Sequence, residues 1–277
     1  MGQLDSSVTT ISRKPTAFDK RIHEIDFLRG CLILLVIFDH IMNHFAFDLP
    51  ATGFWQVMHD AAYWYWYCEP RHIVRFLALI GFCFVSGISC AFSKNNWLRA
   101  GQMILFYAFL AVGSTILEAW DLFDGGLTIY IPFNVIGTLA WSTLLYCFVQ
   151  NKSWRGILIM AILCFLMCQY VIPWIENVNA LRGVEPNAPS LYMPTYYPNK
   201  YGSAVWADWL PLFPFAVFFM IGALVSYFIY MPTRKSIISH KGNWERPFCF
   251  CGRHSLLIYI GHQIILVPIF MLLALIK

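Results

Sequence analysis

The sequence predicts an all-α membrane protein, a polytopic bundle of about seven transmembrane helices with a cytoplasmic N-terminus. Of the 277 residues, 59% are hydrophobic and only 12% are charged, and the mean hydropathy is +0.60. Soluble domains carry about 25% charged residues. Apolar runs of about 20 residues, long enough to cross a bilayer, recur along the chain. The net charge of +4 is therefore interpreted as a signal of how the chain is oriented in the membrane. No basic cluster indicates nucleic-acid binding.

The apolar runs follow a polar start and continue to the last residues. Residues 1–20 contain no apolar segment, so we expect a disordered cytoplasmic tail and no cleavable signal peptide. Residues 21–277 show no internal repeat and no sign of a second domain, which predicts one integral membrane domain. The expected spans are residues 26–47, 72–93, 99–119, 128–149, 155–175, 209–231 and 248–275.

Charge alternates between successive loops and predicts the orientation. The cationic loops contain, among others, Lys20, Lys94, Lys152 and Lys235. The intervening loops are acidic or nearly free of cations. Because cytoplasmic loops are enriched in Lys and Arg, this pattern predicts a multi-pass protein of the cell membrane with its N-terminus inside and its C-terminus outside.

Two expected external loops are rich in aromatic residues. Residues 48–71 contain the run Tyr63–Tyr67, and residues 176–208 contain several Tyr and Pro residues. Tyr and Trp are common where a protein meets the membrane surface, which is one explanation. The alternative is a lid or platform that stacks on a sugar, since long loops in compact proteins are usually functional. Residues 52–67 could also form an interfacial or re-entrant helix.

The nine cysteines show no CxxC pair and no metal-ligand spacing. Most of them lie within apolar runs, where cysteine behaves as a small hydrophobic residue. We therefore expect neither a disulfide framework nor a metal site.

The first span contains ionisable residues on one face. Arg29 and His40 are eleven residues apart, which is about three helical turns, so their side chains point the same way roughly 16 Å apart. Asp26 lies on the same face. Ionisable residues inside a membrane helix are costly and indicate a functional site. A structural role, with Arg29 extending to the headgroups, is the alternative.

The last span repeats this arrangement. Arg253 lies near its cytoplasmic end, His262 lies at a depth similar to that of His40, and Tyr259 is three residues before His262 and hence on its face. We therefore predict that His40 and His262 share a site. Guanidinium groups at one end suit phosphates, and imidazoles at the other suit proton transfer to or from a reacting carbonyl. Acyl coenzyme A has this form, with phosphates and a thioester joined by a flexible arm.

Two acidic residues each have alternative roles. Asp208 opens the sixth span at the outer surface, where it could bind the acceptor, orient an imidazole or cap the helix. Asp39 points about 100° away from His40, so it could partner a neighbouring helix or pair with His44.

Several segments resemble a known family. The stretch RIHEIDFLRGCLILLVIFDH resembles the first helix of the transmembrane acyltransferase superfamily, which has an Arg followed by ten residues and a His. The segments FLALIGFCFVSGISCAFSKN, DWLPLFPFAVFFMIG and GRHSLLIYIGHQ are similar to the heparan-alpha-glucosaminide N-acetyltransferase-like bacterial membrane proteins. In the last segment, Ser255, Tyr259 and His262 match the family motif. The resemblance covers about residues 21–270.

The resemblance implies transfer of an acetyl group from cytoplasmic acetyl-CoA to an amine or hydroxyl of an extracytoplasmic sugar or glycan. Arg29 and His40 carry over as the Arg–His motif, and His262 carries over as the histidine of the last motif. Arg29 and Arg253, with Asp26 and Ser255 near them, are then the expected residues for binding acetyl-CoA. His40 is the leading general base, with His262, Tyr259 and Asp208 as further catalytic candidates.

Other assignments stay open at the level of sequence. The family's catalytic histidine in an early loop could correspond to His40, His44 or His59. A proton-coupled small-solute transporter is the alternative function, because intramembrane His, Asp and Arg also form proton relays. The sequence does not identify the oligomeric state, and a homodimer is compatible with it.

Overall fold

The computed structural model describes residues 22–93, 95–119, 134–151, 153–171, 174, 210–232, 236–237 and 243–275. Within them the regular secondary structure is all helical and includes no strand, as predicted. The helices are α1 (His23–Phe47), α2 (Gln56–Tyr67), α3 (Glu69–Cys90), α4 (Asn96–Ala119), α5 (Val135–Cys147), α6 (Trp154–Leu166), α8 (Leu212–Val225), α9 (Arg246–Arg253) and α10 (Ser255–Ala274). Short 3₁₀ turns precede α2 and α9 at Gly53–Trp55 and Asn243–Glu245. One π-helical turn each follows α6 and α8, at Met167–Val171 and Ser226–Tyr230.

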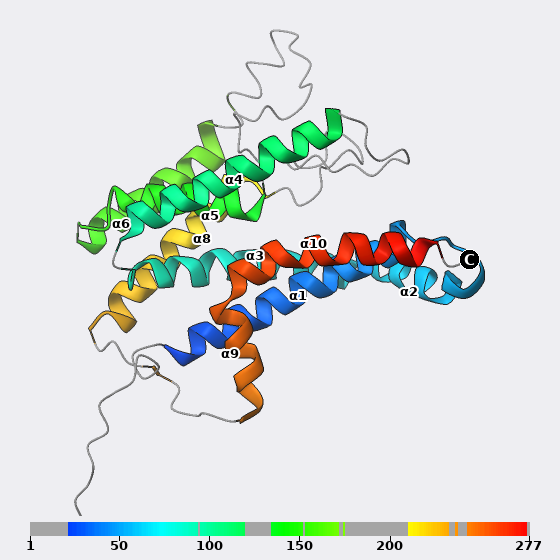
Figure 1. Cartoon of the computed structure of the whole chain (residues 1–277). Coiled ribbons are helices and arrows are strands. Elements are labelled where there is room, and N and C mark those ends of the chain that lie inside the picture. Colours follow the sequence, from blue (N-terminus) through cyan, green and yellow to red (C-terminus); the bar gives the residue numbers. More distant parts are fainter. Residues whose placement is uncertain are drawn as a thin grey trace, which may run out of the picture.

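The helices form two groups that meet mainly where α3 packs against α8. Helix α1 packs against α2, α3, α9 and α10 (Figure 1). In the other group, α5 and α6 pack against α8, and α4 packs against α5. A hydrophobic core that includes the fully buried Phe219, Met220 and Ile136 lies largely in the second group and extends to Ile33 of α1 and Tyr259 of α10.

Glycine permits the α3–α8 contact. A Cβ on Gly87 would lie 1.9 Å from the Phe219 carbonyl oxygen, and a Cβ on Gly222 would lie 2.0 Å from the Phe84 oxygen. Small residues let membrane helices approach to this distance. The main chains of α3 and α8 therefore touch directly, and this fixes the two groups against each other.

Among the described residues, four helices are both long enough and apolar enough to cross a membrane. They are Glu69–Cys90, Trp154–Val171, Leu212–Tyr230 and Ser255–Ala274, and the shorter apolar helix Val135–Cys147 accompanies them. The membrane class is thereby supported. The expected number of seven spans and the cytoplasmic side of the N-terminus stay predictions.

Two predicted elements differ from the structure. The expected single span at 248–275 is two helices, because the backbone at His254 leaves the helical region (φ −106°, ψ 18°) and ends α9 before α10 begins. Much of the expected external loop at 48–71 is the helix α2, which agrees with the alternative of an interfacial helix. The loop at 176–208, including Asp208, lies outside the described residues, as does the tail at 1–20.

Candidate functional site

The two predicted histidines meet between α1 and α10. The imidazole rings of His40 and His262 lie edge to face, with their centroids 4.8 Å apart and their planes at 71°. Helices α1 and α10 run side by side at this point (Figure 1). His262 is 7% exposed and Tyr259 is also buried, with its ring 5.5 Å from that of His262. The prediction of a shared location, made from equal depth, is confirmed.

Main-chain contacts determine which nitrogen of each ring can take a proton. His40 Nδ1 lies 2.8 Å from the Val36 carbonyl oxygen, and His262 Nδ1 lies 2.5 Å from the Tyr259 oxygen. A carbonyl can only accept a hydrogen bond, so Nδ1 carries the hydrogen in both rings. In the neutral tautomers, Nε2 is then the basic atom of each histidine.

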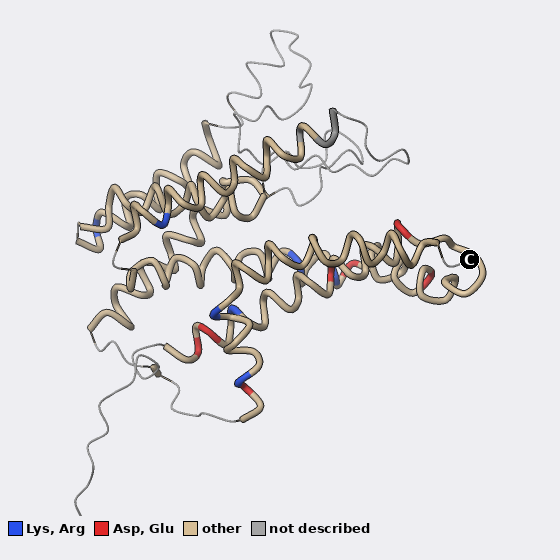
Figure 2. The backbone as a smooth tube through the Cα atoms, in the orientation of Figure 1, with Lys and Arg blue, Asp and Glu red and all other residues tan. Residues whose placement is uncertain are grey.

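Cationic residues lie near the other end of α1. Arg253 Nε is 3.6 Å from Asp26 Oδ2 and donates to the Cys249 carbonyl oxygen at 3.2 Å. Arg29 is partly buried on the same helix as Asp26, and Ser255 opens α10 just beyond the break at His254. Basic and acidic positions lie where α9 meets α1 and along the far half of α1 with α2 and α3, whereas α4, α5, α6 and α8 have few (Figure 2).

Glycine also brings α9 onto α1. A Cβ on Gly30 would lie 1.8 Å from the Phe248 oxygen, and a Cβ on Gly252 would lie 1.7 Å from the Asp26 oxygen. His23 Nε2 adds a contact of 2.5 Å to Glu245 Oε2 at the start of α9. Arg253 follows Gly252 directly, so the close approach of the two backbones places its guanidinium beside Asp26.

A third histidine follows one turn beyond His40. His44 Nδ1 is 2.5 Å from Asp48 Oδ2, and its Nε2 is 3.3 Å from Gln263 Oε1. Its ring stacks on that of Phe270, with centroids 4.8 Å apart. The pairing of His44 with Asp39, one of the two alternatives from sequence, is therefore wrong. We call the row of His40, His44, His262 and Gln263 the α1–α10 seam.

Asp39 has a partner on a neighbouring helix, as the other alternative predicted. Both of its oxygens accept from Arg71 of α3, each at 2.8 Å, and Tyr65 of α2 donates to it at 3.1 Å. The Arg71 guanidinium also lies 3.5 Å from the Trp66 ring centroid, and Arg71 is only 4% exposed. Burial and the Asp39 carboxylate raise the pKa of Tyr65 to about 12, so this hydroxyl stays a hydrogen-bond donor.

Sequence reasoning missed Arg71. It lies beside Pro70 in the first turn of α3, where a cation at the end of an expected span resembles a headgroup anchor. The one available signal was Asp39 itself, since an acidic residue in an apolar helix requires a cationic or donor partner.

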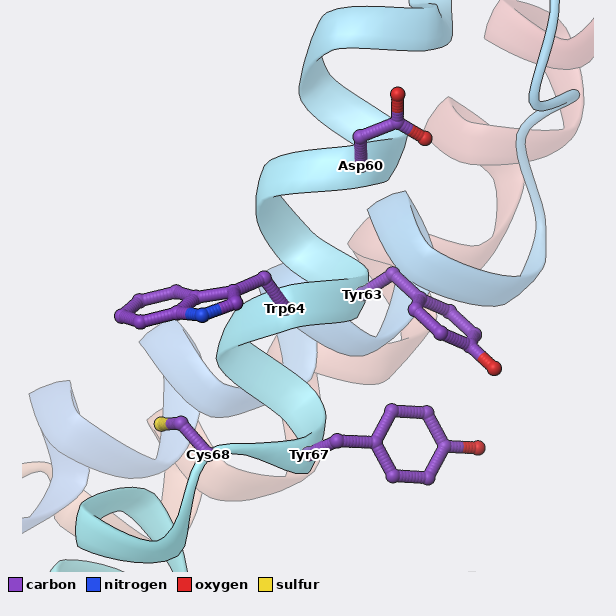
Figure 3. A pocket seen from close by; sticks show the side chains of 5 residues that line it. All are labelled: Asp60, Tyr63, Trp64, Tyr67 and Cys68. Atoms are coloured by element: carbon purple, nitrogen blue, oxygen red, sulfur yellow. The ribbon is translucent and has the colours of Figure 1, made fainter.

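Helix α2 carries an open groove of about 440 Å³ on its aromatic surface. Figure 3 shows Tyr63 and Tyr67 on one side and Trp64 and Cys68 on the other, with Asp60 at one end. The Tyr63 and Tyr67 rings are 4.7 Å apart, and His59 stacks on Tyr63 at 5.9 Å. His59 is therefore part of α2 and lies off the α1–α10 seam.

Fold and site together define a class of protein. It is an integral membrane protein in which histidines and arginines line the contact between otherwise apolar helices. The sequence matches the family described as heparan-alpha-glucosaminide N-acetyltransferase, catalytic, over residues 21–264, and the chain belongs to this family. Family membership indicates a membrane acetyltransferase. A search of curated proteins found no match, and a search of solved structures found none either.

Proposed function

We propose that this protein transfers an acetyl group from cytoplasmic acetyl-CoA to an amine or hydroxyl of a sugar outside the membrane. The observation that carries the proposal is the 4.8 Å contact between His40 and His262 in a chain of the acetyltransferase family. An imidazole with Nε2 as its basic atom can accept a proton there, and once protonated it can donate a hydrogen bond to an oxygen on which charge develops.

The separation of the two ends of the site suits an acyl coenzyme A. Arg29 and Arg253 would bind its phosphates, since guanidinium is the preferred partner of phosphate. Asp26 orients Arg253, and Ser255 adds a hydroxyl at the start of α10. About 16 Å of helix separates Arg29 from His40, a length that an extended acyl arm can bridge. The thioester would then reach His40, His262 and Tyr259.

The acceptor would approach from the end of α1 that carries α2. Phe47 near the end of α1 contacts Tyr63 and Trp66, so the aromatic residues of α2 lie at the end of α1 that follows His44. Aromatic faces with an adjacent carboxylate such as Asp60 suit a sugar ring with hydroxyl or amino groups. Asp208 is a further candidate for this end. A homodimer is compatible with the proposal.

The test is thiol release by purified protein in lipid or detergent. Acetyl-CoA is supplied with glucosamine, and separately with a mixed glycan extract, for the wild type and for His40→Ala. We expect the wild type to bind acetyl-CoA and release thiol, and His40→Ala to lose at least about 100-fold in rate, the usual range for groups that transfer a proton or stabilise developing charge.

The control is His72→Ala. His72 is an exposed histidine of α3 outside the seam, and this variant should keep wild-type activity. A folded wild-type protein that binds no acetyl-CoA would refute the proposal and direct attention to proton-coupled transport. Equal activity of His40→Ala and wild type would remove the imidazole pair from the mechanism.

A further inference from the structure

The three seam histidines differ in what their Nδ1 atoms contact. In His40 and His262 this atom faces a neutral main-chain carbonyl, at 2.8 and 2.5 Å. In His44 it faces the Asp48 carboxylate at 2.5 Å. A carboxylate at Nδ1 fixes the tautomer and stabilises the imidazolium that forms when Nε2 takes a proton. A carbonyl dipole stabilises that charge less.

The three rings also differ in the charges near them, and hence in how well each can carry a proton. His40 and His262 are 4.8 Å apart, so a proton gained by one opposes a second proton on the other. His44 lies one turn, about 6 Å, farther along α1 than His40. A positive charge there is balanced by Asp48, which is four residues away on the same helix.

The position of His44 suits the acceptor. Asp48 ends α1, and the neighbouring Phe47 contacts the aromatic residues of α2. Gln263 lies 3.3 Å from His44 Nε2, and because amide oxygen and nitrogen can be exchanged in assignment, its NH₂ can donate to this atom. The hydroxyl or amine of the sugar that receives the acetyl group also carries a hydrogen that can be donated to Nε2. It could therefore replace Gln263 at Nε2, while Phe270 keeps the ring in place.

We propose that His44, oriented by Asp48, is the base that takes the proton of the acceptor. This inference rests on the proposed function and assigns to His44 the role that the sequence favoured for His40. The acceptor oxygen or nitrogen forms a bond to the thioester carbon, and its proton passes to His44 Nε2. The carbon–sulfur bond then breaks, and the departing thiolate receives that proton, which leaves His44 neutral. One ring of the His40–His262 pair, in its protonated form, donates a hydrogen bond from Nε2 to the thioester oxygen.

The experiment compares binding with turnover. Acetyl-CoA binding and acceptor-dependent thiol release are measured for wild type, His44→Gln, Asp48→Asn and the surface control His72→Gln. We expect His44→Gln to keep the acetyl-CoA affinity and lose at least about 100-fold in acceptor-dependent rate. Asp48→Asn should lose less, and His72→Gln should equal the wild type. Free imidazole should restore turnover in His44→Gly, which a merely structural role would not allow.

The outcomes are distinct from those for the proposed function. If the wild type neither binds acetyl-CoA nor releases thiol, the acetyltransferase proposal itself fails, and this inference fails with it. If the wild type is active and His44→Gln turns over at the wild-type rate, His44 is not the base. If His44→Gln no longer binds acetyl-CoA, the test passes to the turnover rate of Asp48→Asn. A folded Asp48→Asn variant that turns over at the wild-type rate overturns the inference.

Discussion

At the scale of single residues, the Asp39–Arg71 pair shows how an acidic residue is accommodated inside an apolar helix. Both carboxylate oxygens accept from one guanidinium, which also lies over Trp66, so the charges are satisfied by geometry that a lysine cannot reproduce. The pair joins α1 to α3, and Tyr65 joins α2 to both. Asp39, which directly precedes His40, is thereby held by α2 and α3.

Loss of this pair should weaken the fold. Arg71→Ala leaves the Asp39 carboxylate, only 19% exposed, without its cation, and we expect about 3 kcal/mol of destabilisation. Arg71→Lys should recover only part of it. The measurement is the melting temperature in detergent, with Arg75→Ala, an exposed arginine one turn along α3, as the control. Equal melting temperatures for Arg71→Ala and Arg75→Ala would show that the pair contributes nothing.

At the scale of elements, the contact of α9 with α1 determines the cationic end of the site. Gly252 and Gly30 leave no room for a side chain between the two backbones. The break at His254 lets α9 leave the direction of α10 and reach α1. Arg253 therefore depends on a glycine contact for its position beside Asp26.

Gly252→Ala tests this dependence. The new methyl group would meet the Asp26 carbonyl oxygen at 1.7 Å, so α9 must move, and we expect at least 1–3 kcal/mol of destabilisation together with weaker acetyl-CoA binding. Gly101→Ala in α4 is the matched control, because no atom lies within 4 Å of its added Cβ. That substitution should stabilise the helix by about 0.5–1 kcal/mol. Unchanged stability and binding in Gly252→Ala would contradict the close approach of α1 and α9.

The sequence predicted the helices and the His40–His262 contact because both follow from helical periodicity and depth. It did not predict the break at His254, since no proline marks it. The close main-chain contact at Gly252 depends on tertiary structure, and so does the pairing of Arg71, which was missed. A partner on another helix, such as Asp39 for Arg71 or Gln263 for His44, has no spacing rule in the sequence.

At the scale of the whole molecule, the orientation in the membrane is the main untested prediction. The cation pattern of the loops places the N-terminus in the cytoplasm and, with an odd number of spans, the C-terminus outside. Fusions of a reporter to each end should therefore report opposite compartments. Activity of a cytoplasm-dependent reporter at both ends would require an even number of spans and would revise the span count.

The proposed chemistry is confined to one side of the bundle. Helices α1, α9 and α10 supply the residues toward acetyl-CoA and the acceptor, and α2 supplies the aromatic groove. The group of α4, α5, α6 and α8 carries few charged residues and reaches this side through the α3–α8 contact (Figure 2). We expect this group to support α3, which holds α1 through the Arg71–Asp39 pair.

The continuity of α1 has a consequence for substrate choice. Asp26, Arg29, His40, His44 and Asp48 belong to one helix or its cap, so the distances between them are set by the rise per residue and cannot be adjusted by a hinge. Under the proposed function, the helix fixes the distance between the end expected to bind phosphates and the imidazoles. A thioester on a shorter arm would stop below His40, and one on a longer arm would have to fold, whatever acyl group it carries.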